Sequence, residues 1–161
     1  MEVYFVDIGR GTSNLILLGG RRAIVIDCGQ NSGSLLQLLA QFRVDTIARL
    51  IISHNHHDHV GGAMALLTQY EGRVDRICFV HDDVLLKSKF GGKILQQIKN
   101  GTLKSSQLLR LECDHSPRYI FQESNDLPTL QIVSPTFTDN LQAITEGNPN
   151  ATSGVLVLGS V

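Results

Sequence analysis

Four of the six histidines in this chain of 161 residues fall within six consecutive positions, beside one aspartate. An apolar run comes before the cluster and Gly61-Gly62 follows it, which predicts a buried strand that ends in a loop and opens a helix. Side chains two residues apart in an extended backbone project from one face, so two of the histidines can bind the same ion. The residues after the turn can approach that ion from another direction. Imidazoles with one carboxylate suit zinc or a similar transition metal and suit calcium poorly. The candidate metal ligands are His54, His56, Asp58 and His59.

A histidine-rich tract can also be a surface accident or an expression tag. A tag would lie at a terminus, whereas this cluster lies inside the chain between an apolar run and a glycine pair. The spacing and the strand-to-helix context agree with each other, so we interpret the cluster as a metal site.

The spacing His54-x-His56-x-Asp58-His59 resembles the metal-binding signature of the metallo-β-lactamase-fold hydrolases. The surrounding sequence is similar to the hydrolase domain of ComEC-type DNA-uptake proteins and their free-standing relatives. This resemblance implies an α/β fold, a metallo-β-lactamase-like αββα four-layer sandwich with mixed sheets and the metals at one edge. Residues 1–161 would form the N-terminal and central part of one such domain. The segments that are similar to that subgroup are Phe5–Gly11, Leu15–Leu18, Ile24–Gly29, Leu130–Pro135 and Asn150–Leu158.

The resemblance also assigns roles to the candidate ligands. His54 and His56 would bind the first of two divalent ions, and Asp58 and His59 the second. Zinc is the expected metal, with manganese as an alternative. Coordination lowers the pKa of a bound water from about 15.7 towards about 7, which provides a hydroxide for attack at neutral pH. Asp58 is the candidate catalytic residue, because it can also orient the attacking water.

Two further aspartates follow predicted strands. Asp7 and Asp27 are candidates for holding the ligating imidazoles in the required tautomer. Each can equally well cap a turn, which is a common role for aspartate at such positions.

Composition indicates one ordinary globular domain, with 42% hydrophobic residues and a net charge of −1. No apolar run approaches the roughly 20 residues that span a bilayer, and the first residues do not resemble a signal peptide, so we expect a cytoplasmic protein. Cys28, Cys78 and Cys113 are far apart and form no Cys-x-x-Cys pair. We expect them to be free thiols in a reducing compartment, with Cys28 a small core residue rather than a ligand.

Apolar patterning alternates between strands and helices, which favours an α/β layered sheet that opens with an antiparallel meander. Gly19-Gly20 predicts a hairpin turn between two of the strands. The first helix is expected after Asn31 or Ser32, the second from Val60, and a third from His81. The expected strands span residues 1–8, 15–18, 23–26, 49–53 and 76–80.

Charge is distributed unevenly along the chain. Between Val84 and Leu111 there are six basic residues and no acidic residue. Such a segment can steer a polyanion towards the site. It can equally be a solvated helix face, because no aromatic residues are interleaved to stack on bases. The basic residues are Lys87, Lys89, Lys93, Lys99, Lys104 and Arg110.

The substrate class follows from weaker indications. A helix that starts at Gly61-Gly62 would present free N–H groups to the metals and would favour a phosphate. Together with the basic segment and the ComEC-type resemblance, this predicts a nuclease or phosphodiesterase that acts on DNA, another nucleic acid or another phosphodiester. Hydrolysis of small esters, thioesters or lactams by the same hydroxide is the alternative.

The site is incomplete in sequence. Relatives generally add a third histidine to the first metal, and the corresponding segment, Ser134–Phe137, has none; His81 and His115 are the remaining candidates. The last family ligands are expected after the strand Val155–Leu158, past Val161. Three explanations follow: a missing C-terminal segment, a partner chain that completes the fold, or a non-catalytic subunit that pairs through an exposed sheet edge.

Overall fold

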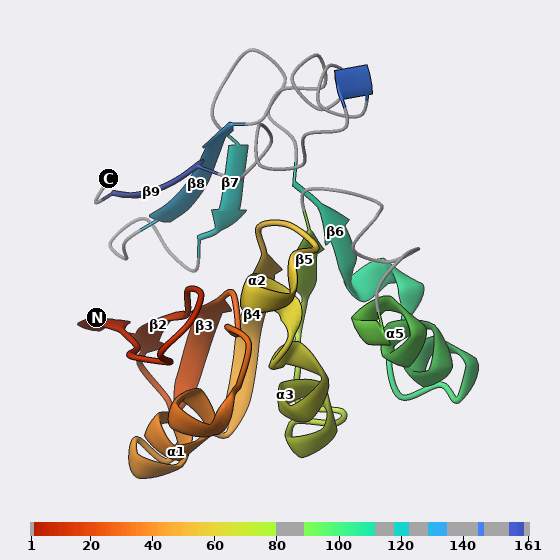
Figure 1. The fold of residues 1–161 in the computed structure, drawn as a ribbon, viewed down its shortest axis with the longest axis horizontal. Coiled ribbons are helices and arrows are strands. Elements are labelled where there is room, and N and C mark those ends of the chain that lie inside the picture. Colours follow the sequence, from red (N-terminus) through yellow and green to blue (C-terminus); the bar gives the residue numbers. More distant parts are fainter. Residues whose placement is uncertain are drawn as a thin grey trace.

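The computed structural model describes residues 2–79, 89–111, 118–122, 129–134, 145–146 and 155–159. The N-terminal part forms a six-stranded sheet in which the strands follow one another in chain order (Figure 1). Its first three strands are antiparallel, whereas β3 to β6 run parallel, so the sheet is mixed. The strands are β1 (Glu2–Phe5), β2 (Asn14–Leu18), β3 (Arg22–Ile26), β4 (Thr46–Ile52), β5 (Ile77–Phe79) and β6 (Leu108–Arg110).

The antiparallel opening follows the sequence prediction, with one strand shorter than expected. β2 and β3 form the predicted hairpin, and Gly20 and Arg21 take positive φ angles of 68° and 60° in its turn. β1 ends at Phe5 rather than at residue 8. The chain turns there because Gly9 and Gly11 also adopt positive φ angles, which glycine tolerates without steric cost.

In the part of the chain that the structure describes, three helices cover one face of the mixed sheet (Figure 1). They are α1 (Gly33–Gln41), α3 (Ala63–Gln69) and α5 (Lys89–Lys99), and a short 3₁₀ turn, η1 (Ser105–Gln107), precedes β6. The predicted apolar stripe of α1 buries Leu35 and Leu39 completely. Within the part of the chain that the structure describes, no helix is long and apolar enough to cross a membrane. The helix side of the core includes Leu15, Val25, Leu35, Leu39, Leu50, Ile52, Leu66, Leu67 and Ile94.

A second sheet packs against the opposite face of the mixed sheet. β7 (Arg118–Phe121), β8 (Thr129–Ser134) and β9 (Val155–Gly159) form a three-stranded antiparallel sheet. Alternate strand residues point to opposite faces, so Ile24 and Ile51 pack with Phe121 and Leu130 while their neighbours face the helices. The predicted mixed α/β fold is confirmed. Of the four expected layers, the described residues provide one helical layer and two sheets, and the second sheet is antiparallel rather than mixed.

Two of the three cysteines are described by the structure, and both lie in the core. Cys28 and Cys78 are free and completely buried, and Cys113 lies outside the described residues. Burial raises the pKa of the Cys28 thiol well above its usual value and raises that of Cys78 to about 12. Both thiols are therefore protonated core groups at neutral pH.

Candidate metal centre

The histidine cluster lies where β4 ends and the short helix α2 (His57–Val60) begins (Figure 1). The helix starts inside the motif and not at Val60 as predicted, because His56 keeps an extended backbone while its carbonyl accepts hydrogen bonds from the backbone N–H groups of His59 and Val60. Asp58 therefore belongs to the first helical turn, where its negative charge is favoured.

Three of the motif's imidazoles lie together. The His54 ring centroid is 4.7 Å from that of His56 and 3.9 Å from that of His59. Asp58 completes the group, with Oδ2 3.9 Å from Nε2 of His59. Burial is the main cause that lowers the pKa of His54 to about 4, so its imidazole is neutral near pH 7, as a metal ligand must be.

The buried carboxylate of Asp27 holds this group in place through hydrogen bonds. Its carboxylate is 4% exposed, and its Oδ2 accepts a hydrogen bond from Nδ1 of His59 at 2.8 Å. This hydrogen bond is the main cause that raises the pKa of His59. Ser53 donates to the same carboxylate twice, from its backbone N–H at 2.8 Å and from its hydroxyl at 2.7 Å.

Ser53 links Asp27 to a second histidine, His54, through hydrogen bonds. The Ser53 oxygen lies 3.0 Å from Nδ1 of His54. Because the hydroxyl proton points to Asp27, the oxygen can only accept here, which places the His54 proton on Nδ1. Both His54 and His59 thus keep Nε2 available for a ligand. Sequence reasoning missed Ser53, although its position directly before the first histidine was a usable signal.

Asp7, the other candidate for orienting a histidine, does not reach the cluster. Its exposed carboxylate accepts a hydrogen bond from the backbone N–H of Gly9 at 3.1 Å, so it caps its own turn. The turn-capping alternative describes Asp7, and the orienting role describes Asp27.

Three loops that are distant in sequence are bonded to each other around the cluster. Thr12 donates its N–H to the Asp58 carbonyl at 3.2 Å, and Cys28 donates to the His59 carbonyl at 2.7 Å. A Cβ on Gly11 would lie 1.8 Å from the same Asp58 oxygen. Glycine is therefore required where this loop touches the motif.

The backbone N–H groups of the glycine pair after the motif, Gly61 and Gly62, are both engaged in hydrogen bonds. Gly61 donates its N–H to the His57 carbonyl at 2.8 Å and Gly62 donates to Gly29 at 2.9 Å, so neither N–H is free to attract an anion. A Cβ on Gly62 would lie 2.4 Å from the Cys28 carbonyl oxygen. The pair permits close approach of backbones, and its own two N–H groups are not available to a phosphate.

The donor set fits a divalent transition metal. Three imidazoles and a carboxylate are the ligands that zinc prefers, and two of the imidazoles have an assigned free nitrogen. In the residues that the structure describes, no three histidine, cysteine or acidic side chains already surround one point as a closed metal site. His81, His115 and residues 135–137 lie outside the described part, so a third histidine for the first metal stays a prediction.

Comparison with protein families matches residues 8–152 to the metallo-beta-lactamase superfamily. The chain belongs to this superfamily. Superfamily members are generally hydrolases and typically bind divalent metals. No curated protein matches the sequence significantly.

Several solved structures are similar to this chain at low sequence identity. Human tRNase Z, short form, is 15% identical with a TM-score of 0.51, over 82% of this chain and 58% of that one. The B3 metallo-beta-lactamase BLEG-1 is 14% identical with a TM-score of 0.48, over 81% and 60%. Zn²⁺-bound PqqB from Methylobacterium extorquens is 14% identical with a TM-score of 0.42, over 78% and 42%. The chain spans 60% or less of the length of these relatives.

Replacing Asp27 by asparagine tests how this superfamily member orients its histidines. The amide keeps the shape but loses the charge that holds the His59 proton, and it cannot accept all of the present hydrogen bonds. We expect zinc affinity to fall by about 10- to 100-fold, as measured by competition with a chromophoric chelator. Asp45→Asn is the control, because Asp45 pairs with Arg21 on the surface. Equal affinities for the two variants would contradict the role of Asp27.

Proposed function

We propose that this chain provides the catalytic residues of a metal-dependent hydrolase that acts on phosphodiesters, as a nuclease or phosphodiesterase. The observation that carries the proposal is the gathering of His54, His56 and His59 beside Asp58, with two of the rings fixed through Asp27. Such an arrangement of a neutral buried imidazole and an oriented imidazole favours ligation over a purely structural role.

Each residue of the motif has a distinct role in this proposal. His54 and His56 hold one divalent ion and Asp58 and His59 a second, with zinc preferred and manganese as the alternative. When bound, such ions supply a water of lowered pKa and stabilise charge on a substrate oxygen. The Asp58 side chain is 41% exposed, so it can reach and orient a water on the solvent side.

The polar surroundings favour a phosphodiester over a lactam. Arg10 and Gln30 line a hollow together with Asp58, and a cation beside the reacting group suits an anionic substrate. The ComEC-type resemblance supports the same substrate class. Small esters, thioesters and lactams remain the alternative substrates for the same residues.

A substrate panel tests the proposal. The purified chain, stripped of metal and reloaded with zinc or manganese, is incubated with bis-p-nitrophenyl phosphate, DNA, a lactone and nitrocefin. We expect cleavage of the two phosphodiesters and loss of that cleavage in EDTA. Cleavage of only the lactone or nitrocefin would refute the phosphodiester assignment. No hydrolysis at any metal loading would favour a non-catalytic subunit.

A further inference from the structure

We infer that a groove past Asp58, with Arg10 on one side and Lys89 on the other, binds the phosphates that flank the cleaved bond in a nucleic acid. This inference rests on the proposed phosphodiesterase function and extends it from a single ester to a strand. It assigns binding roles to Arg10, Lys89 and His57, none of which belongs to the candidate ligand set.

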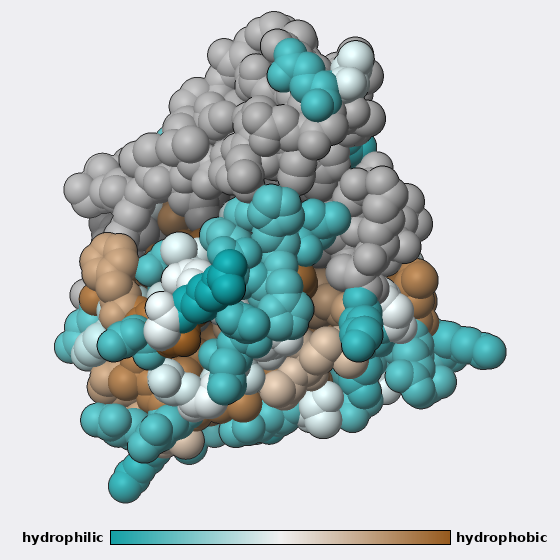
Figure 2. All heavy atoms as spheres, viewed as in Figure 1, coloured by the Kyte–Doolittle hydropathy of each residue, from teal (hydrophilic) through white to brown (hydrophobic). Residues whose placement is uncertain are grey.

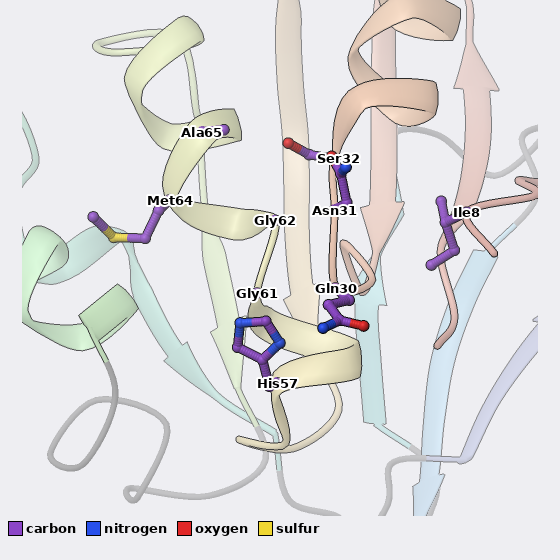
Figure 3. Close-up of a pocket in the computed structure, with 9 residues that line it drawn as sticks. All are labelled: Ile8, Gln30, Asn31, Ser32, His57, Gly61, Gly62, Met64 and Ala65. Carbon is purple, nitrogen blue, oxygen red and sulfur yellow. The ribbon is translucent and has the colours of Figure 1, made fainter. Parts of the chain in front are cut away.

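The groove consists of three adjoining hollows that share His57. The largest, of about 590 Å³, lies between Gln30 and the Gly61-Gly62 turn, and Figure 3 shows the His57 ring and the Gln30 side chain near each other at its edge. A hollow of about 190 Å³ adds Arg10 and Asp58. His57 lines each of them, so the hollows adjoin at this ring, and Asp58, a candidate ligand, lines the hollow that contains Arg10.

The third hollow extends the groove away from Arg10. It has a volume of about 280 Å³ and is lined by Asn55, His57 and Lys89, among others. Lys89 is the first residue of α5 and belongs to the basic segment. Arg10 and Lys89 thus line different hollows on two sides of His57, so they can contact two separate phosphates.

The charge and polarity of the groove fit a phosphodiester strand. Arg10, His57 and Lys89 are exposed, and within the described residues neither Arg10 nor Lys89 is part of an ion pair. Among the described residues, Asp58 is the single acidic one that lines these three hollows. Figure 2 shows hydrophilic atoms gathered over the centre of this face, in the region of α2.

The lining also predicts how the strand is recognised. Phe90 borders the third hollow but is only 1% exposed, so it offers no face on which a base could stack. Contacts from Arg10, Lys89 and the His57 ring would address phosphates and would not read bases. We therefore expect binding without sequence preference, with an affinity that depends strongly on salt.

Oligonucleotide binding in EDTA tests the groove separately from catalysis. Fluorescence anisotropy with a labelled single-stranded DNA of about 12 nucleotides is recorded between about 50 and about 200 mM salt. Arg10→Ala and Lys89→Ala should each weaken binding about 3- to 10-fold and lower the slope of log affinity against log salt by about 0.7. Lys99→Ala, at the other end of α5, and Arg43→Ala, at an exposed turn, are the matched controls and should leave the slope unchanged.

The outcomes separate this inference from the proposed function. Absence of wild-type binding at about 50 mM salt, or equal slopes for groove and control variants, would each overturn the groove. Wild-type hydrolysis of bis-p-nitrophenyl phosphate tests the proposed function alone. Salt-dependent binding that is weakened, with a lower salt slope, in Arg10→Ala and Lys89→Ala would support the groove whether or not that ester is cleaved.

Discussion

Asp58→Asn is expected to hydrolyse bis-p-nitrophenyl phosphate at least about 100-fold more slowly than the wild-type chain under equal zinc loading. The amide has the same shape as the carboxylate, but it lacks the negative charge that a second metal and an attacking water require. Since the Asp58 side chain is 41% exposed, its replacement removes no buried packing. The loss should therefore appear in the rate and in metal content, while the unfolding transition stays near that of the wild type.

Two measurements make the Asp58 result decisive. Steady-state kinetics with bis-p-nitrophenyl phosphate give the rate, and elemental analysis after dialysis gives the metal content per chain. Asp45→Asn removes an equal charge from a surface ion pair and should change neither. A rate for Asp58→Asn within about threefold of the wild type would exclude Asp58 from catalysis.

Gly11→Ala is expected to lower the free energy of unfolding by about 2 to 5 kcal/mol. The new Cβ would lie 1.8 Å from the Asp58 carbonyl oxygen, and the φ angle of 96° is unfavourable for alanine. Either the loop around Gly11 or the motif backbone must move. Because Thr12 bonds to the same oxygen, that movement also disturbs the metal ligands.

Gly9→Ala separates the two causes of this loss. Gly9 has a similar positive φ angle of 76°, but a Cβ there meets nothing within 4 Å. Its replacement should cost only the backbone term of about 1 to 2 kcal/mol. Urea denaturation of the three proteins measures the difference as a shift of the midpoint. Equal midpoints for Gly9→Ala and Gly11→Ala would show that the loop does not press on the motif.

Local sequence was enough to predict the strands and the helix that come before the histidine motif. Hydrophobic periodicity over α1 and the glycine turn before β3 depend on neighbours within a few residues, and both predictions are confirmed. Boundaries were less accurate, since β1 stops at Phe5 and α2 begins at His57. Those ends depend on the backbone conformation of single residues, because Gly9 and Gly11 turn the chain after β1 and His56 keeps an extended backbone before α2.

The sequence by itself determined the donor types, their spacing and the superfamily, because a ligand motif on one strand-to-helix connection is a local feature. Only the tertiary structure decided that Asp27 orients the histidines while Asp7 caps a turn. It also decided that Gly61 and Gly62 serve backbone contact. Parallel strands bring the ends of β3 and β4 to one edge of the sheet, so residues far apart in sequence meet there. The same placement at the sheet edge brings Arg10 and Lys89 to two sides of His57. Sequence periodicity does not predict this arrangement.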